Sequence, residues 1–363
     1  MTLATDTDAG ALRDVLADQL AAAGYGPEWV RAVRAVPRHL FVPVFHDQDP
    51  AGGWRTVHAG DPGYLDAVYQ DRALTTQVTD GVPTSSSSEP TLMLAMLDAL
   101  DVEAGNRVLE CGTGTGWNAA LLAHRLGDAN VTTVDVDPEL TAGAARHLAR
   151  AGYRPTVHSG DGAAGSPDHA PFDRFIATCG LQSVPWPWVE QAAGSAVMIV
   201  PIGWGLARID VRKGEAHGRF LPQDAYFMAR RTHACGPRFG ALEGAVPNRT
   251  GVGLDDLMDR LQFPLSLALP GYRWCTWPGD RKVTGSVGIW TPDGSTVTAT
   301  ADGTVRQTGP RRLWDVVEDL DQVFRSAPDR TDFGLTLTSS RQRAWWRHPD
   351  GPGWDLPATV VAG

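Results

Sequence analysis

The sequence is short of cysteine, of positive charge and of long apolar runs, and each shortage excludes a class of protein. Only four cysteines occur in 363 residues, without C-x-x-C spacing, at Cys111, Cys179, Cys235 and Cys275. We therefore expect neither a zinc site nor a redox pair, and no bound metal. Few, scattered cysteines are typical of reduced proteins, which predicts a cytoplasmic location.

Positive charge is also scarce, because 32 Lys and Arg residues face 42 Asp and Glu residues and leave a net charge of −10. A negative balance argues against nucleic-acid binding, which requires cations that neutralise phosphates. No run of about 18 apolar residues is present, so we expect no membrane span. The segment Met1–Gly10 has no basic stretch followed by an apolar one, and we expect no secretory signal.

Composition and length point to a globular protein of about two domains with an added N-terminal element. Apolar residues at helical spacing predict helices over 8–24 and 27–35. Residues 40–43 read as a short buried extended segment. Residues 46–66 are rich in Asp, Gly and Pro and are predicted to form a surface loop.

From residue 90 the predicted strands and helices alternate. We expect helices at 90–102, 117–126, 138–151 and 188–192, and strands at 107–110, 131–134, 157, 172–178 and 196–200. Such alternation with short connections is typical of an α/β fold, with helices on both faces of a parallel sheet. We predict a Rossmann-like domain with a mostly parallel sheet.

The character of the chain changes near residue 240, and seven of its thirteen tryptophans lie after residue 250. Residues 289–307 resemble a β-meander, a helix is expected after Pro310, and 333–338 alternates like a strand. We predict a small, separate C-terminal α+β domain. The expected division is an N-terminal helical, substrate-side element at 1–80, the main α/β domain at 81–240 and the C-terminal domain at 241–363.

The sharpest local pattern is a glycine-rich turn between a predicted strand and a predicted helix. Gly112, Gly114 and Gly116 follow the apolar strand at alternate positions, with Thr113 between the first two. Glycines let a ligand approach the backbone because no Cβ intervenes. In open α/β sheets the carboxyl ends of the strands are where ligands bind.

The spacing of this turn favours S-adenosyl-L-methionine over a dinucleotide. Dinucleotide sites have G-x-G-x-x-G, whereas this chain has G-x-G-x-G preceded by the acidic Glu110. Glu110 is expected near the positive ammonium or sulfonium group, and the helix after Gly116 near the carboxylate of the cofactor. An NAD-dependent oxidoreductase and a methyltransferase-like binding module without activity are the alternatives.

Two further acids follow the next two predicted strands. Asp135 can accept hydrogen bonds from both ribose hydroxyls, and Asp161, followed by Gly162, can bind the adenine amino group. Each acid alone could serve as a turn or cap residue. Their joint spacing after successive strands favours the cofactor interpretation.

Several segments together resemble the protein-L-isoaspartate O-methyltransferase family over about residues 10–235. The matching segments are 36–43 (V-P-R-x-x-F-V-P), 69–74 (Y-x-D-x-x-L), 85–90, 160–162 (G-D-G), 171–173 (P-F-D) and 200–203 (V-P-I-G). The resemblance implies a class I methyltransferase that uses S-adenosyl-L-methionine. It places Ser88 at the active-site serine, and Glu110, Gly112, Gly114, Asp135, Asp161 and Gly162 at cofactor positions.

The serine segment departs from the family pattern, because Ser86-Ser87 replaces Thr-Ile and Glu89 replaces Gln. Ser88 could instead, or in addition, cap the helix that begins at Pro90. Arg38 and Arg72 are candidates for contact with the substrate carboxylate. We expect Ser88 to orient that carboxylate rather than to act as a nucleophile.

The resemblance implies a substrate that is an aspartate- or isoaspartate-containing peptide or protein. The altered serine segment and the tryptophan-rich C-terminal part favour an aspartyl side chain in a ribosomally made peptide, whose ester then collapses to succinimide (aspartimide) or isoaspartate. The alternative is repair methylation of the α-carboxyl of L-isoaspartyl residues in damaged proteins.

Overall fold

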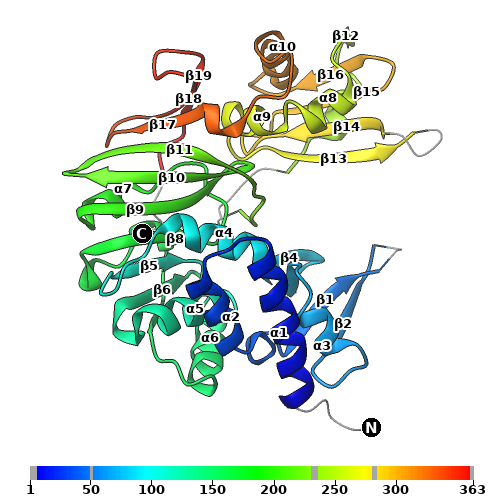
Figure 1. Ribbon diagram of the computed structural model, residues 1–363. Helices are drawn as coiled ribbons and strands as arrows, with labels where there is room; N and C mark the ends of the chain where they lie inside the picture. Colours follow the sequence, from blue (N-terminus) through cyan, green and yellow to red (C-terminus); the bar gives the residue numbers. More distant parts are fainter. Residues whose placement is uncertain (1–5, 50–51, 230–235, 280–283, 360–363) are drawn as a thin grey trace.

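The structure is a computed structural model that describes residues 6–49, 52–229, 236–279 and 284–359. It contains a four-stranded N-terminal sheet, a ten-stranded central sheet and a five-stranded C-terminal sheet. Figure 1 shows the helices α1, α2 and α4 beside the central sheet, and the C-terminal sheet stacked beyond its far end. No helix in the described part of the chain is long and apolar enough to cross a membrane.

The central sheet has the strand order β19-β18-β17-β11-β10-β9-β8-β5-β6-β7. Its parallel half comprises β7 (Thr156–Ser159), β6 (Val131–Asp135), β5 (Val108–Cys111), β8 (Phe172–Ala177) and β9 (Ala192–Ile202). β10 (Gly205–Arg212) and β11 (Glu215–Asp224) continue it in antiparallel fashion. The Rossmann-like α/β fold is confirmed, but the complete sheet is mixed rather than mostly parallel.

Alternating side chains of the central strands supply two apolar cores, one on each face. In β8 the side chain of Ile176 joins one core, while Phe175 joins the other. Successive residues of a strand point to opposite faces, so a continuous apolar run is what a sheet covered on both faces requires. The first core is closed by α1 (Asp6–Ala22), α2 (Pro27–Ala35), α4 (Pro90–Leu100) and α5 (Trp117–Leu126). The second face carries α7 (Trp186–Glu190), and α6 (Pro138–Arg150) packs on β6 and β7.

The N-terminal part contains more strand than the sequence suggests. About half of residues 46–66, expected as a loop, fall in β1 (Val44–Gln48), β2 (Trp54–His58) and the start of α3 (Tyr64–Val68). With β3 (Leu74–Thr79) and β4 (Val82–Ser87) these strands form the sheet β2-β1-β3-β4. The segment 40–43 is buried at Phe41 and Val42 as expected, but its first half is not extended, because Leu40 ends a 3₁₀ turn and Phe41 has helical backbone angles. The expected boundary at residue 80 lies in the turn between β3 and β4.

The C-terminal part has a sheet of its own and also contributes three strands to the central sheet. Its own sheet comprises β12 (Asn248–Arg249), β16 (Thr304–Thr308), β15 (Thr296–Thr300), β14 (Thr284–Trp290) and β13 (Arg273–Pro278), in that order. The same part of the chain contains three helices: α8 (Leu254–Asp259), α9 (Gln262–Ala268) and α10 (Leu313–Val323). The last strands, β17 (Phe333–Leu337), β18 (Gln342–Trp346) and β19 (Gly353–Leu356), return to the central sheet, where β17 pairs with β11. One apolar core spans both parts, so they fold against each other.

Candidate active site

The glycine turn directly follows β5, and all three of its glycines have a positive φ. The φ angles of Gly112, Gly114 and Gly116 are +105°, +51° and +88°. A Cβ on Gly116 would lie 3.1 Å from the Cβ of Ala144 on α6, in addition to the strain of its backbone. The turn therefore requires glycine, and it brings the start of α5 against α6.

The acid at the end of β6 is bound to this turn. The backbone N–H of Gly114 donates a hydrogen bond of 3.0 Å to Oδ2 of Asp135, and the N–H of Asp137 donates one of 3.1 Å to Oδ1. The backbone N–H of Gly160, after β7, donates to the carbonyl of Asp135 at 2.9 Å. The ends of β5, β6 and β7, which the sequence analysis singles out separately, are thus neighbours.

Asp161 and Gly162 follow β7 and lie at the same carboxyl end of the parallel strands. Oδ1 of Asp161 accepts a hydrogen bond of 3.0 Å from the N–H of Ala163. Gly162 is buried, and a Cβ there would come within 2.2 Å of the Cys111 sulfur, so the loop after β7 packs directly on the end of β5. This close approach accounts for the glycine in the G-D-G segment.

Glu110 lies inside the fold rather than on the open side of the turn. Its side chain is 0% exposed, accepting hydrogen bonds of 2.7 Å from Asn118 Nδ2 and 2.6 Å from Thr133 Oγ1. Burial raises the pKa of Glu110 to about 7, although the hydrogen bonds from Thr133 and Asn118 favour the ionised form. Thr113 is also buried, with its hydroxyl 2.7 Å from that of Thr133. Glu110 and Thr113 are thus buried behind the turn, where both contact Thr133.

An apolar residue that the sequence analysis overlooked lies next to Asp135. Val136 is 50% exposed, although it directly follows a strand that is buried throughout its first four residues. A half-exposed valine beside a strand-end acid offers an apolar surface for a flat ring. The pattern of a buried strand, an acid and then an apolar residue was the sequence signal that could have identified it.

The serine run forms the end of β4 and lies beside the glycine turn. Ser85 and Ser87 are buried, with Ser85 Oγ bonded to Thr76 and Ser87 Oγ bonded to Arg38. The hydroxyls of Ser86 and Ser88 have no hydrogen-bond partner among the residues that the structure describes. A Cβ on Gly114 would lie 3.6 Å from the carbonyl oxygen of Ser86. The serine run and the glycine turn are therefore neighbours, and the half-buried Ser88 lies two residues after Ser86.

Arg38 anchors this segment and does not face a substrate. The side chain is 0% exposed, and its guanidinium donates to the carbonyls of Ser87 and Ser88 at 3.2 and 2.9 Å. Its other donors reach the Ser87 hydroxyl and the carbonyl oxygens of Val68, Gln70 and Arg72. The expectation that Arg38 could meet the substrate carboxylate is wrong, because burial and these six bonds occupy all its N–H-bearing nitrogens. Arg72, 37% exposed as a side chain, pairs with Asp47 at 3.0 Å.

Ser88 does not cap α4. The residue before the helix is Glu89, which makes no side-chain cap, and Asp71 provides one by accepting a hydrogen bond of 2.8 Å from the N–H of Thr91. Burial raises the pKa of the half-buried Glu89, and the nearby Asp71 raises it further. The alternative interpretation of Ser88 as a cap is therefore wrong.

The described residues fit S-adenosyl-L-methionine. The site offers a glycine turn with positive φ angles for close backbone approach, a half-buried carboxylate at Asp135 for a diol, and the apolar Val136 for the adenine ring. These groups stand in the order in which the amino-acid end, the ribose and the adenine of the cofactor follow one another.

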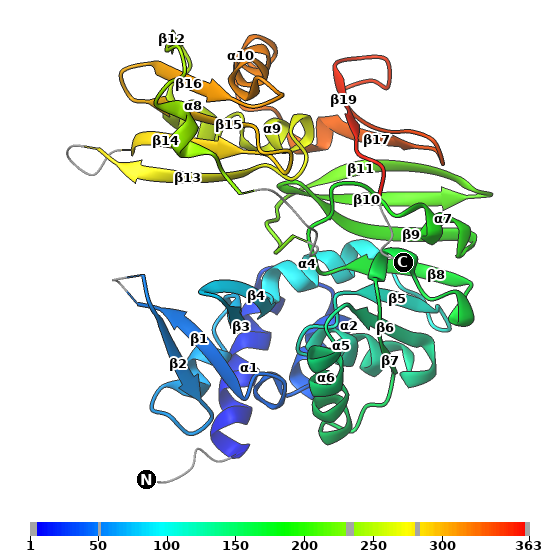
Figure 2. The ribbon, with the colours of Figure 1, turned by 180° about the vertical axis from the view of Figure 1, so that it is seen from behind.

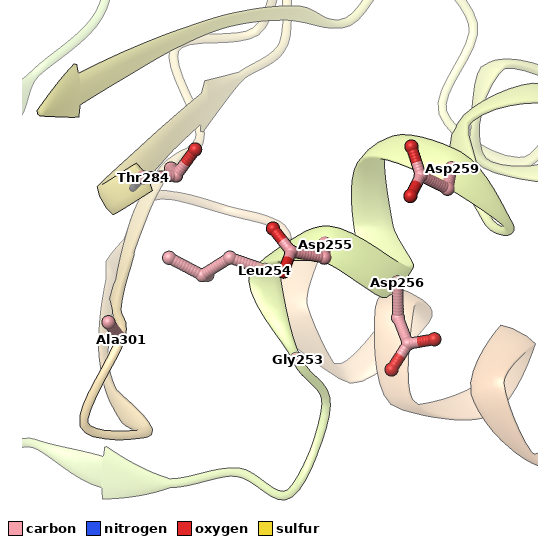
Figure 3. Close-up of a pocket in the computed structure, with 7 residues that line it drawn as sticks. All are labelled: Gly253, Leu254, Asp255, Asp256, Asp259, Thr284 and Ala301. Atoms are coloured by element: carbon pink, nitrogen blue, oxygen red, sulfur yellow. The ribbon is translucent and has the colours of Figure 1, made fainter. Parts of the chain in front are cut away.

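A cavity lies in the C-terminal part of the chain (Figure 3). Its volume is about 470 Å³, and the residues around it are Gly253, Leu254, Asp255, Asp256, Asp259, Thr284 and Ala301. Figure 3 shows its carboxylates on α8, and Asp256 pairs with Arg260 at 3.1 Å. None of the residues predicted to bind the cofactor lines this cavity.

Comparison with known proteins agrees with this geometry. The model of the family "Protein-L-isoaspartate(D-aspartate) O-methyltransferase" matches residues 56–221. The protein-L-isoaspartate O-methyltransferase of Gloeobacter violaceus is 37% identical over 188 residues, which are 51% of this chain and 80% of the relative. Protein-L-isoaspartate O-methyltransferase 2 of Pelobacter propionicus is 31% identical over 64% of this chain and 89% of its own length.

A solved structure titled protein-L-isoaspartate O-methyltransferase shares the overall fold. The TM-score is 0.55 at 19% identity, and the alignment covers 96% of this chain and 100% of the other. Fold and site define a class I methyltransferase that takes its methyl group from S-adenosyl-L-methionine. The chain belongs to the protein-L-isoaspartate O-methyltransferase family and is a carboxyl O-methyltransferase. The resemblance inferred from the sequence is confirmed.

Proposed function

We propose that this enzyme methylates the α-carboxyl group of L-isoaspartyl residues in damaged proteins. The observation that carries the proposal is the family match over residues 56–221, together with relatives that bear the same name over most of their length. These relatives support repair better than the peptide-tailoring role that the sequence analysis placed first. The order of the two interpretations is therefore reversed.

On the cofactor side, the proposed roles follow the geometry. Gly112, Gly114 and Gly116 admit the amino-acid end of the cofactor to the backbone, and Asp135 accepts hydrogen bonds from the ribose hydroxyls. Asp161 accepts one from the adenine amino group, while Gly162 allows its loop to approach β5. Glu110 and Thr113 act through the turn, because both are buried beneath it. When bound, S-adenosyl-L-methionine supplies an electrophilic methyl group.

On the substrate side, the enzyme needs no general base. A carboxyl group with a reference pKa near 4 is already ionised at neutral pH. The contribution of the chain is to position the carboxylate and to remove water from it. We assign the orienting hydrogen bond to the hydroxyl of Ser88, which lies in the half-buried segment beside the turn. Arg38 keeps that segment in place through its carbonyl contacts.

The methyl ester then reacts without further help from the site residues. The backbone nitrogen of the next residue in the substrate attacks the ester carbonyl, its proton is lost and methanol leaves. The resulting succinimide opens by addition of water to either carbonyl, which gives aspartate or isoaspartate. Repeated cycles convert isoaspartate to aspartate, because only the isoaspartyl form is methylated again.

Paired peptides test the proposal. Two synthetic peptides of the same sequence, one with an L-isoaspartyl linkage and one with a normal aspartyl linkage, are offered with S-adenosyl-L-methionine carrying a labelled methyl group. We expect base-labile labelled ester only on the isoaspartyl peptide. Label on the aspartyl peptide in preference would overturn repair and support peptide tailoring. The normal aspartyl peptide is the matched control because it differs in one linkage.

The tailoring role remains the second candidate because of one observation. Residues after 240 lie beyond the family match, yet they pack into the same core as the central sheet and carry much of the tryptophan. The three-part division, a cytoplasmic location and the lack of a nucleic-acid partner remain predictions.

A further inference from the structure

An aromatic stack is formed by residues from two loops of the central sheet, between β9 and β10 and just after β11. The rings of Trp204 and Tyr226 are stacked with centroids 4.4 Å apart, and Tyr226 is 68% exposed. The ring centroid of Trp274, on β13, lies 6.4 Å from that of Trp204. We call these three residues the aromatic shelf. Because most of the Tyr226 side chain is not buried by the fold, its ring is available to contact a ligand.

The shelf lies at the same edge of the sheet as the glycine turn. Tyr226 precedes Met228 by two residues, and the carbonyl of Met228 accepts a hydrogen bond of 2.8 Å from the N–H of Gly180. Two residues before Gly180, the hydroxyl of Thr178 donates to the carbonyl of Gly112 at 2.6 Å. The shelf is thus connected to the turn through the short loop that follows β8.

The start of β13 packs on that same loop. Gly271, two residues before β13, has a φ of +76°, and a Cβ there would lie 2.3 Å from the side-chain nitrogen of Gln182. Gln182 follows Gly180 by two residues. Figures 1 and 2 show β13 on the side of its sheet that faces α4 and the N-terminal sheet.

β13 is also an edge strand with an unpaired side. It stands at the end of the order β12-β16-β15-β14-β13, and within the described ranges its backbone pairs only with β14. An edge strand of this kind accepts an extended polypeptide through backbone hydrogen bonds, and neighbouring side chains provide specificity. Its one charged residue, Arg273, is exposed and suits a segment that carries a carboxylate.

We propose that the free edge of β13 and the aromatic shelf bind an extended segment of the substrate polypeptide, next to the residue that is methylated. The inference rests on the proposed function. It adds that the enzyme recognises the polypeptide next to the methylated residue as well as the carboxyl group. The occupant is an unfolded stretch of the substrate chain, because only an extended backbone can pair with the free edge of β13.

Calorimetry with two peptides tests the inference. One is a capped isoaspartyl dipeptide, and the other carries flanks at least as long as the six residues of β13. Both are titrated into the full chain in the presence of S-adenosyl-L-homocysteine. We expect Tyr226→Ala and Trp274→Ala each to raise the Kd of the long peptide about tenfold and to leave that of the dipeptide unchanged. Val246→Ala, which truncates another exposed apolar side chain, is the matched control and is expected to change neither.

A second version of the long peptide has N-methylated amides in its flanks, which removes the backbone donors. We expect it to bind wild type about tenfold more weakly than the unmodified peptide. An unchanged Kd in Tyr226→Ala, or equal losses for long and short peptides, would overturn the inference. Tight, shelf-dependent binding without methyl transfer would instead overturn the proposed function and leave the inference standing.

Discussion

The carboxylate of Asp135 accepts a hydrogen bond of 3.0 Å from the backbone N–H of Gly114. This contact joins the end of β6 to the turn that follows β5, so the acid and the turn keep one relative position. Hydrogen bonds to an ionised acceptor are stronger than neutral ones. The contact therefore presents the remaining acceptor positions of Asp135 in a fixed orientation.

We expect Asp135→Ala to weaken the binding of S-adenosyl-L-methionine. The variant removes the proposed acceptor of the ribose hydroxyls, and losing hydrogen bonds to a charged group costs about 1.5–3 kcal/mol, which is roughly 10- to 100-fold in Kd. Isothermal titration calorimetry gives the value. The matched control is Glu139→Ala, which removes an exposed acid from nearby α6. An affinity equal to that of wild type would remove Asp135 from the site.

We expect Ser88→Ala to lower kcat/KM for an isoaspartyl peptide about 10- to 100-fold while the cofactor binds as before. The lost hydroxyl is the proposed donor to the substrate carboxylate, and such a hydrogen bond contributes about 1.5–3 kcal/mol. Steady-state methylation and cofactor calorimetry measure the two effects separately. Ser88→Thr retains a hydroxyl and should recover most of the activity. Parallel loss of cofactor affinity and turnover would contradict this role.

We expect Arg38→Lys to lower the free energy of unfolding by about 3 kcal/mol or more. A lysine ammonium has three donors at a single point and cannot satisfy the several carbonyls that the guanidinium reaches, and buried acceptors left without partners are costly. Equilibrium urea unfolding measures the change. In the control Arg34→Lys the replaced arginine belongs to exposed ion pairs with Asp14 and Asp18, so we expect a change below about 1 kcal/mol. Equal effects of the two substitutions would count against the anchoring role of Arg38.

The buried carboxyl of Glu110 should make stability depend on pH. Burial raises its pKa to about 7 in the folded state from its ordinary value of 4.5. The folded protein then binds a proton more tightly than the unfolded chain, so this stabilisation is complete below about pH 4.5 and is lost as pH rises to about 7.

The loss amounts to about 3–4 kcal/mol at most, because each tenfold change in proton affinity corresponds to roughly 1.4 kcal/mol. Unfolding measured from pH 4 to 8 should show this component in wild type and not in Glu110→Gln. Glu103→Gln, on the surface, should behave like wild type. Identical pH profiles for wild type and Glu110→Gln would refute the assignment.

The sequence predicted the secondary structure around the glycine turn well because that structure is local. The strand, the glycine turn and the helix around Gly112–Gly116 are adjacent in the chain, and α2 and α5 have the expected bounds. Strand-end acids become neighbours in any parallel sheet, so the proximity of Asp135 to the turn followed from the fold class. By contrast, spacing could not show that Glu110 and Thr113 point inward.

The N-terminal and C-terminal sheets depend on contacts that lie far apart in the sequence. β4 ends in three serines and contains a proline, so its local strand propensity is low, and it is held by pairing with β3 and by Arg38. The pairing of β17 with β11 joins segments more than a hundred residues apart. No local sequence pattern predicts either contact, so the sequence indicates a loop at 46–66 and does not show that the last strands join the central sheet.

The most direct measurement is a crystal structure of the full chain grown with S-adenosyl-L-homocysteine. We predict density for the nucleoside against the turn Gly112–Gly116, its ribose hydroxyls on Asp135 and its adenine between Val136 and Asp161, with the sulfur turned toward Ser88. Density in the acidic cavity beside α8 instead, or a turn that stays empty at saturating nucleoside, would contradict the account.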